Sequence, residues 1–289
     1  METKWTRRTF LKKAFTGLLG AVGVSSGGIL YAHQIEPGLL EINRFQIHHP
    51  LIPKSFDGVT IIQFSDTHLG FQYTLSQLKK LITKMNSLKP DLVFFTGDLM
   101  DAPNQYKNRK HIAPVLAQLS APLGKYCIYG NHDHGGYGSD LYKNIMQDAE
   151  FTLLKNEARR IQQMDGSSIY IIGIDDAMLG RPDLASAYKQ VPMNMFTLLL
   201  SHAPDLADTA ATYPIHWQLS GHSHGGQVKI PFFGALVIPP YARKYPEGLY
   251  SIGKSSPLKL YVNRGLGTTR LPFRFMAKPE LTVFTLKSG

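Results

Sequence analysis

The stretch Gly130-Asn131-His132-Asp133 directly follows an apolar run over residues 126–129 that predicts a buried strand. Four other short polar segments also follow apolar, β-like runs. They are Asp66-Thr67-His68, Gly97-Asp98, Ser201-His202 and Gly221-His222-Ser223-His224. Because the carboxyl ends of strands in an open α/β sheet meet at one edge, we expect these segments to come together in one site.

Side chains with nitrogen or oxygen donors would gather at that edge from five separate segments. They are Asp66, His68, Asp98, Asn131, His202, His222 and His224. A set of this size is large enough to hold two metal ions that share one ligand. The sequence therefore predicts a dinuclear metal site.

The order D-x-H, G-D, G-N-H-[DE], H and G-H-x-H resembles the signature of calcineurin-like metallophosphoesterases, and every element is present between residues 66 and 224. The resemblance extends nearly to the C-terminus and is greatest to bacterial members exported by the twin-arginine route. It implies an α/β fold, the four-layer αββα sandwich in which helices flank two mixed β-sheets. The alternation of strands and helices from residue 59 to residue 150 is compatible with that fold.

The resemblance also implies a role for each donor. Asp98 would bridge two metal ions. The ligands of one ion would be completed by Asp66, His68 and His224, and those of the other by Asn131, His202 and His222. Two divalent ions about 3.5–4 Å apart neutralise a phosphate ester and hold a hydroxide in line for attack. His132 would be the catalytic histidine, which protonates the leaving oxygen or stabilises the charge on phosphate.

The donor set contains no thiolate, which indicates Mn²⁺, Fe or Zn²⁺, and of these we favour Mn²⁺. The single cysteine, Cys127, excludes an intramolecular disulfide, and its place in an apolar strand predicts a buried, inert thiol. The five histidines outside the motifs are interpreted as incidental. They are His33, His48, His49, His111 and His216.

The N-terminal region, residues 1–32, resembles a twin-arginine export signal. Arg7 and Arg8 are followed by Phe10-Leu11-Lys12, and residues 14–32 carry no charge but contain five glycines. Cleavage of this segment and its retention as a membrane anchor both remain open. We expect residues 33–58 to form a linker with an edge strand, and residues 59–289 to form the phosphoesterase domain.

The chain has 289 residues and a formal net charge of +10, which suits an anionic partner or simple solubility. Basic residues are frequent between positions 241 and 280, where they could form a solvated face or a collar for substrate. Arg264 and Arg243 are candidate substrate residues there, and His134 is a third. Asp175-Asp176 at a strand end is interpreted as a turn in preference to a substrate site.

The segment Pro231–Pro240 is apolar, uncharged and bounded by prolines, so it does not resemble an ordinary central strand. It could pack into the core, or it could form an exposed apolar lip beside the metals that meets a membrane or acyl chains. Together with an export signal, the lip favours an anionic, phosphate-containing substrate of the cell envelope. A lipid-linked pyrophosphate or phosphodiester is the first candidate and a wall polymer is the second.

The leading hypothesis is an exported two-metal phosphoesterase, delivered by the twin-arginine machinery to the cell wall or the outer membrane face. One alternative is a non-catalytic module that binds polyanions or a membrane surface through its metals. Another is a nuclease of the same fold. Nucleic-acid binding would require a longer basic groove with stacking aromatic residues, and the aromatic residues here lie among apolar ones.

Overall fold

The computed structural model describes residues 26–134, 139–253 and 257–289. The proposed export segment lies almost entirely outside this range. Residues 26–30 are helical and continue into a short π-helix, Tyr31–Ile35. Within the described ranges, no helix is both long enough and apolar enough to cross a membrane.

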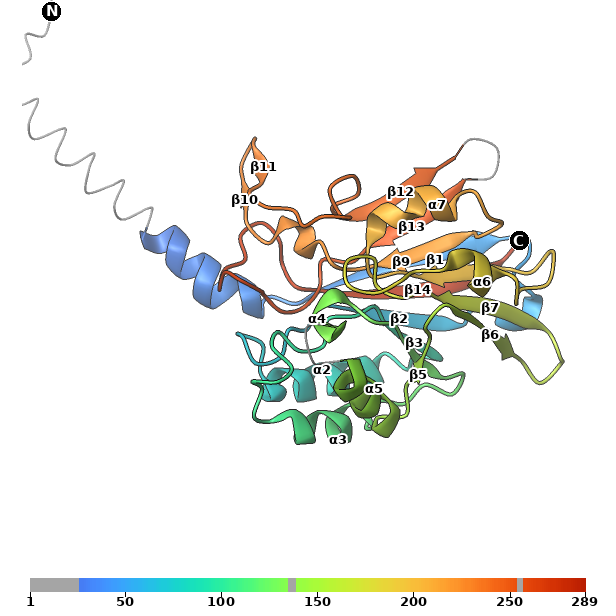
Figure 1. Cartoon of the computed structure of the whole chain (residues 1–289), viewed down its shortest axis with the longest axis horizontal. Coiled ribbons are helices and arrows are strands. Elements are labelled where there is room, and N and C mark those ends of the chain that lie inside the picture. The colour runs from blue at the N-terminus through green and yellow to red at the C-terminus, as the bar shows by residue number, and fades with distance from the viewer. Residues whose placement is uncertain (1–25, 135–138, 254–256) are drawn as a thin grey trace, which may run out of the picture.

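Two six-stranded sheets form the centre of the molecule (Figure 1). The first has the order β1-β14-β2-β3-β4-β5. Its strands are β1 (Glu41–His49), β2 (Thr60–Phe64), β3 (Leu92–Phe95), β4 (Lys125–Cys127), β5 (Thr152–Leu153) and β14 (Glu280–Ser288). The second has the order β12-β13-β9-β8-β7-β6. Its strands are β6 (Glu157–Gln162), β7 (Ser168–Gly173), β8 (Thr197–Leu200), β9 (Trp217–Ser220), β12 (Gly248–Ile252) and β13 (Leu258–Val262).

Helices cover the outer faces of both sheets. α2 (Leu75–Ser87), α3 (Ile112–Leu116) and α5 (Ser139–Asp148) lie against the first sheet, and α6 (Leu184–Tyr188) and α7 (Ala207–Ala210) lie against the second (Figure 1). Thr74 begins α2 through a capping box with Gln77, as the sequence pattern predicts. The expected α/β sandwich with two mixed, helix-flanked sheets is confirmed.

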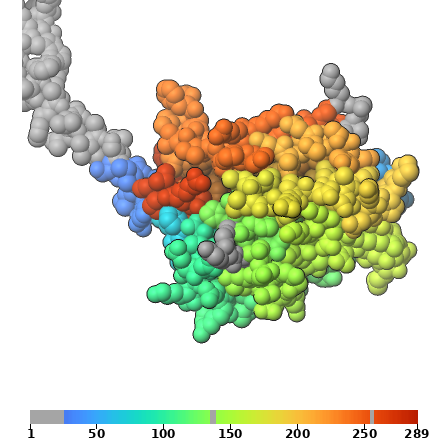
Figure 2. Space-filling view, viewed as in Figure 1, coloured from blue at the N-terminus to red at the C-terminus, as the bar shows by residue number. Residues whose placement is uncertain are grey.

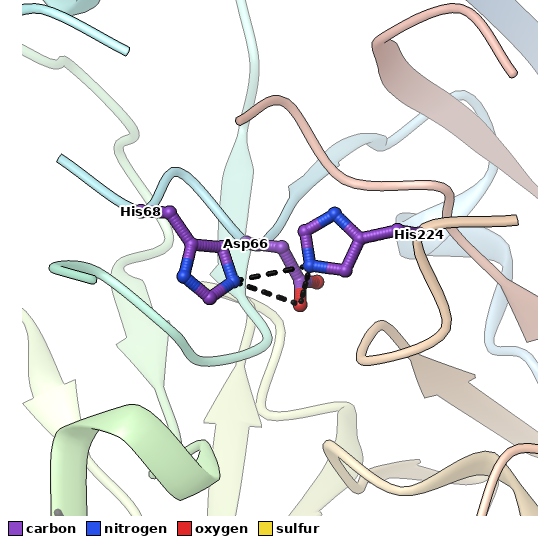
Figure 3. Close-up of side chains that lie close together, drawn as sticks. All are labelled: Asp66, His68 and His224. Atoms are coloured by element: carbon purple, nitrogen blue, oxygen red, sulfur yellow. Dashed lines mark hydrogen bonds and ion pairs between the residues drawn. The ribbon is translucent and has the colours of Figure 1, made fainter. Parts of the chain in front are cut away.

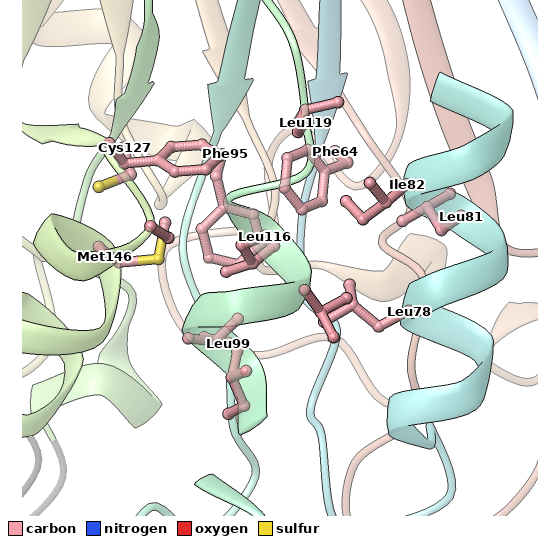
Figure 4. Packing of buried hydrophobic residues seen from close by; sticks show 14 of the residues in the cluster. Phe64, Leu78, Leu81, Ile82, Phe95, Leu99, Leu116, Leu119, Cys127 and Met146 are labelled. Atoms are coloured by element: carbon pink, nitrogen blue, oxygen red, sulfur yellow. The ribbon is translucent and has the colours of Figure 1, made fainter. Parts of the chain in front are cut away.

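Three apolar cores follow from the two-residue period of the strands. Phe95 of β3 points to the helical side, where it meets Leu116 and α2 (Figure 4). Its neighbour Phe94 points the other way, into the core between the sheets, with Leu198 and Leu200 of β8. Leu199 then faces the outer core beside α6 and α7. Adjacent residues in one strand therefore belong to different layers, which gives four layers in all.

The edge strand expected within residues 33–58 is observed as β1, which pairs in parallel with β14 at the edge of the first sheet. Residues 41–49 are therefore part of the same sheet as β2, β3 and β4, which precede three of the five motifs. Cys127 is fully buried in the helical core (Figure 4). Burial raises the pKa of its thiol, as expected for an unreactive structural cysteine.

Candidate metal centre

Parallel strands from both sheets end beside one site. β2 is followed by Asp66, β3 by Asp98 and β8 by His202, while β9 is followed by His222. Asn131 begins the short helix α4 (Asn131–His134), four residues after β4. The two sheets are joined directly at this end because the side-chain amide of Gln63 donates to the backbone oxygen of Ser220 at 3.0 Å.

Five of the seven expected ligands have a left-handed backbone, a conformation that non-glycine residues seldom adopt. The φ angles are 51° at Asp66, 43° at His68, 61° at Asp98, 70° at His222 and 52° at His224. All five lie within four residues after the end of a strand. Backbone strain that is concentrated at one set of polar residues is typical of a functional site.

Two glycines of the motifs are required because atoms of neighbouring loops lie very close to their Cα atoms. Gly97 has a φ of 99°, and a Cβ there would lie 2.6 Å from the backbone nitrogen of Gly130 and 2.8 Å from Nδ1 of His202. A Cβ on Gly221 would clash with Ser65 and with the carboxylate of Asp66. Glycine at these positions therefore lets the ligand loops lie against one another.

Asp66, His68 and His224 form a first cluster of possible ligands (Figure 3). Nε2 of His224 lies 3.1 Å from Nε2 of His68 and 3.5 Å from Oδ1 of Asp66. Two imidazole nitrogens that face each other at this distance need a proton or a cation between them. The carboxylate directed at the same point favours a cation.

Asp98, His202 and His222 form a second cluster, whose ligand atoms lie within 4.8 Å of one another. The backbone oxygen of Thr96 accepts a hydrogen bond from Nδ1 of His202 at 2.6 Å, which leaves Nε2 free to bind. The backbone oxygen of Pro240 accepts from Nε2 of His222 at 2.8 Å, which leaves Nδ1 free. Backbone acceptors of this kind fix the tautomer of metal-ligating histidines.

Two buried polar atoms of the expected ligands have no hydrogen-bond partner among the described residues. They are Oδ1 of Asn131 and Nε2 of His202. An unsatisfied buried acceptor is costly, and native structures seldom keep one without a purpose. Both atoms are lone-pair donors, so the site fits a bound cation.

Asp98 lies between the two clusters. Its Oδ2 is 3.5 Å from Nε2 of His68 and 3.3 Å from Nε2 of His202. Burial alone would raise the pKa of this carboxyl, but the facing rings of His202, His132 and His68 hold it well below its usual range. An ionised carboxylate that faces both clusters is the arrangement expected of a bridging ligand.

Asp133 holds the loop of Asp98 in place. Its carboxylate accepts hydrogen bonds from the backbone N–H groups of Asp98 at 2.8 Å, Leu99 at 3.0 Å and Gly130 at 2.9 Å. Burial raises the pKa of Asp133, and the charge of Asp98 adds to the effect. The carboxylate in the Gly130-Asn131-His132-Asp133 motif therefore has a structural role, which is to join two ligand-bearing loops.

His132 lies beside the clusters, with its side chain 24% exposed. Its Nδ1 donates a hydrogen bond to the backbone oxygen of Asp101 at 2.7 Å, so Nε2 is the nitrogen left to exchange a proton. Burial opposes a charge on this ring, but the charge of Asp98 and the oxygen of Asp101 outweigh it and raise the pKa of His132. The position suits the acid role that the resemblance implies.

Asp101 was not predicted as a site residue, but in the structure it contacts two residues that were, His68 and His132. Its Oδ1 accepts hydrogen bonds from Nδ1 of His68 at 3.1 Å and from the hydroxyl of Thr269 at 2.7 Å. Its backbone oxygen holds His132. The sequence offers little signal for this role, since Asp101 is simply an acidic residue three positions after Asp98.

Arg274 supports the first cluster from behind. Its guanidinium is fully buried and donates to the backbone oxygens of Gly267, Ala277 and Arg264. Its Nη2 lies 3.4 Å from Nδ1 of His224. Burial, the ring of His68 and the charge of Arg274 together lower the pKa of His224 well below its usual value. The ring therefore stays neutral, as a metal ligand must.

A cavity of about 240 Å³ opens over the clusters. One wall carries His68, Asp98, His132, His222 and His224. Much of the remaining lining is apolar and includes Val228, Leu236, Val237, Pro239, Pro240 and Leu271. Arg270 also lines the cavity, beside Gln227 and Thr269. A cavity lined both by possible metal ligands and by apolar side chains suits a substrate with polar and apolar parts.

Much of the apolar wall comes from the segment Pro231–Pro240, for which the sequence left two placements open, in the core or as an exposed lip. β10 (Lys229–Ile230) and β11 (Gly234–Ala235) form a hairpin, which projects from the body of the molecule (Figure 2). At its tip Phe232 is fully exposed and Phe233 is 88% exposed. The interpretation of Pro231–Pro240 as core is therefore wrong, and the segment is an exposed lip.

The three candidate substrate residues do not line this cavity. Nε2 of His134 is 2.6 Å from Oδ1 of Asp175, and the guanidinium of Arg264 contacts Glu280 at 2.8 Å and Glu41 at 2.5 Å. Arg243 is exposed outside the lining. These positions do not support a role for them in binding substrate here. The sequence alone does not show which basic side chains are already paired with carboxylates in the folded protein.

Comparison with known proteins shows to which family a chain with this site belongs. The family model described as calcineurin-like phosphoesterase matches residues 59–226. The chain belongs to this family and is a metal-dependent phosphoesterase. The family prediction made from the five motifs is therefore confirmed.

Several relatives match over nearly the whole chain. The metallophosphoesterase YkuE of Bacillus subtilis is 48% identical over 285 residues, which cover 99% of both chains. The UDP-2,3-diacylglucosamine pyrophosphatase LpxG of Chlamydia trachomatis is 28% identical over 87% of this chain and 91% of its own. The phosphodiesterase YaeI of Escherichia coli is 27% identical over 97% of this chain and 99% of its own.

Proposed function

We propose that this phosphoesterase is an exported enzyme of the cell envelope that hydrolyses a phosphodiester or pyrophosphate bond in a lipid-linked substrate. One observation carries the proposal. The cavity that holds the expected metal ligands also has an apolar wall, and that wall continues into the exposed hairpin. A soluble phosphomonoester would have no use for such a wall, whereas an acyl or polyprenyl chain would bury apolar surface against it.

The chemistry follows from the two clusters. Asp66, His68 and His224 would hold one divalent ion and Asn131, His202 and His222 the other, with Asp98 shared between them. Ions held there, Mn²⁺ being favoured, would neutralise the phosphate oxygens and activate water for attack. His132 would give its proton to the leaving oxygen while Asp101 keeps the ring oriented.

Arg270 is the residue best placed to bind a second negative group of the substrate. It lines the cavity together with His132, and no ion pair to it is found in the described part of the chain. Its backbone φ of 61° is maintained by Gln227, whose side chain bonds the backbone of both Thr269 and Leu271. A guanidinium that extends into the cavity lining from a backbone held in this way suits the non-scissile phosphate of a diphosphate.

The relatives support the same substrate class, since one is named as a pyrophosphatase acting on a diacylated sugar nucleotide and another as a phosphodiesterase. The twin-arginine motif supports export to the outer membrane face or the cell wall. The intact ligand set argues against a non-catalytic binding module. The short, largely apolar cavity argues against a nuclease, which would need an extended basic groove.

The test is turnover by the metal-loaded enzyme on four soluble or lipid-linked substrates. They are a phosphomonoester, a soluble phosphodiester, a soluble diphosphate diester and a lipid-linked diphosphate. We expect the highest kcat/KM on the lipid-linked diphosphate, with a preference for Mn²⁺. Activity confined to the monoester, or equal on soluble and lipid-linked diphosphates, would overturn the lipid part of the proposal.

A further inference from the structure

Three segments that are distant in the sequence meet at one end of the molecule. They are the N-terminal helical segment over residues 26–38, the hairpin over residues 228–237 and the loop over residues 271–278. In Figure 1 the helix and the hairpin project at the same end, on the left, opposite the turn between β6 and β7. Figure 2 shows the three segments close together at that end.

Hydrogen bonds join these segments into one surface. The backbone N–H of Lys229 donates to Phe275 at 2.9 Å, and Phe275 donates to Gln227 at 2.9 Å. The backbone N–H of Arg274 donates to Ala32 at 2.9 Å. The rings of Tyr31 and Phe275 pack edge to face with centroids 6.3 Å apart. The loop is therefore held between the hairpin and the helix.

This end presents large apolar side chains to solvent from all three segments. We call them the apolar rim. Its members are Ile29, Leu30, Ile35, Ile230, Phe232, Phe233, Leu236, Val237, Leu271 and Met276. The most exposed members are the two phenylalanines at the hairpin tip. An apolar surface of this kind, built on a hydrogen-bonded frame, indicates a binding surface.

The rim is accompanied by positive charge. Arg270 and Lys278 are exposed, and each lies within two residues of an exposed rim residue in the loop. Neither takes part in an ion pair within the ranges that the structure describes. Exposed cations around an apolar surface complement the phosphate groups of a bilayer, whereas they would repel one another across an interface between two copies of this chain.

The geometry points to a peripheral membrane-docking surface, in which the apolar rim inserts into a phospholipid bilayer while Arg270 and Lys278 meet the headgroups. Leu236, Val237 and Leu271 belong to both the rim and the cavity wall. Docking through the rim would therefore place the cavity at the level of the headgroups. Residues 26–32, which belong to the N-terminal segment of this surface, carry no charge.

Docking is tested by fluorescence, which requires no turnover. Phe232→Trp is placed in the full-length protein and mixed with phosphatidylglycerol-containing vesicles, with and without brominated acyl chains. Met164→Trp is the matched control, because Met164 is fully exposed in the turn between β6 and β7 at the opposite end. The signal of Trp5 and Trp217 is subtracted with the wild-type protein.

We expect a blue shift and quenching by brominated lipid for Phe232→Trp and neither for Met164→Trp. Vesicle co-sedimentation should fall several-fold in Phe232→Ser/Phe233→Ser and remain unchanged in Met164→Ser/Met193→Ser. Because these side chains are exposed, turnover of a soluble phosphodiester should be retained and serves as the check on folding. Vesicle-bound Phe232→Trp protein whose introduced indole is not quenched by brominated lipid would overturn the inference.

Two further outcomes would also overturn the inference. One is a change from dimer to monomer in the Phe232→Ser/Phe233→Ser variant while its vesicle binding stays unchanged. The other is equal quenching at both ends of the molecule. Docking without activity on any lipid-linked substrate would reject the proposed substrate and leave the docking surface intact, so the two proposals can fail separately.

Discussion

The backbone oxygen of Asp101 accepts a hydrogen bond from Nδ1 of His132 at 2.7 Å, while the carboxylate of the same residue accepts one from Nδ1 of His68. One residue therefore fixes the tautomers of the expected acid and of an expected metal ligand. The two contacts use different atoms of Asp101, so they can be separated by substitution. This makes the roles of the surrounding residues testable one at a time.

His132→Ala should retain both metal ions and lose most of its turnover. General acid catalysis contributes about 10²–10⁴-fold, and the ring of His132 is not part of the proposed ligand set. Metal content and kcat are measured on the same preparation. Asp98→Asn is the comparison and should lose metal and activity together. A folded His132→Ala protein with full activity would refute the role assigned to this histidine.

Asp101→Asn should weaken metal binding more than it affects proton transfer. The amide keeps the backbone oxygen that orients His132 but holds His68 poorly, and loss of such a supporting contact typically costs about 10–100-fold in metal affinity. Metal titration monitors the effect, and excess metal should restore most of kcat. Thr269→Val removes only the hydroxyl contact to Asp101 and should have a smaller effect. Lost activity that excess metal fails to restore would contradict this assignment.

Arg270→Gln should raise KM for a diphosphate substrate by about tenfold or more, because a charge-assisted contact contributes about 1.5–3 kcal/mol. KM for a soluble phosphodiester without a second phosphate should change little. Arg243→Gln is the matched control, since Arg243 is an exposed arginine outside the cavity lining. Equal losses on both substrates would show that Arg270 does not distinguish them.

His216 should make the fold less stable in mild acid. Its Nδ1 accepts the backbone N–H of Thr197 at 3.0 Å, and burial together with nearby His49 lowers the pKa of His216 to about 4. Between pH 6.5 and 4 the unfolded chain binds a proton that the folded chain rejects, so the free energy of unfolding falls as pH falls. After allowance for the partly exposed ring, the effect is about 1–2 kcal/mol.

His216→Asn keeps an acceptor for Thr197 but cannot titrate, so its loss of stability between pH 7 and pH 4.5 should be smaller than in the wild type. Urea unfolding at several pH values measures the difference. His111→Asn, at an exposed histidine, should leave the pH dependence unchanged. The same pH dependence in His216→Asn and wild type would rule out the explanation.

Arg7→Lys combined with Arg8→Lys should leave the enzyme active but retained in the cytoplasm, because an export signal is read as an address and contributes nothing to the site. Cell fractionation with an activity assay measures the distribution. Normal export of the double variant would show that the paired arginines are not a twin-arginine signal.

The family, the fold and the seven donors were all predictable from the sequence, because each motif is a short run of polar residues that directly follows an apolar strand. Adjacency in the chain determines where a strand ends, and the parallel arrangement of the strands brings their ends to one edge. The capping box at Thr74 and the buried strand at Cys127 were predictable as well, because each depends on residues that are neighbours in the sequence. The structure brings six of the seven donors, all but Asn131, into two adjoining clusters that share the region around Asp98.

Other features depend on contacts between residues far apart in the sequence. Asp101 supports His68 and His132 only because three loops meet. Arg264 is engaged because the fold brings Glu280 and Glu41 beside it, and Glu41 is 223 positions away in the sequence. Whether an apolar segment such as Pro231–Pro240 is buried depends on which other segments pack against it. The composition of the segment does not contain that information. The chain by itself determined which chemistry is present. Only tertiary packing decided which cations remain free, which histidine nitrogen can bind and which apolar surface stays open.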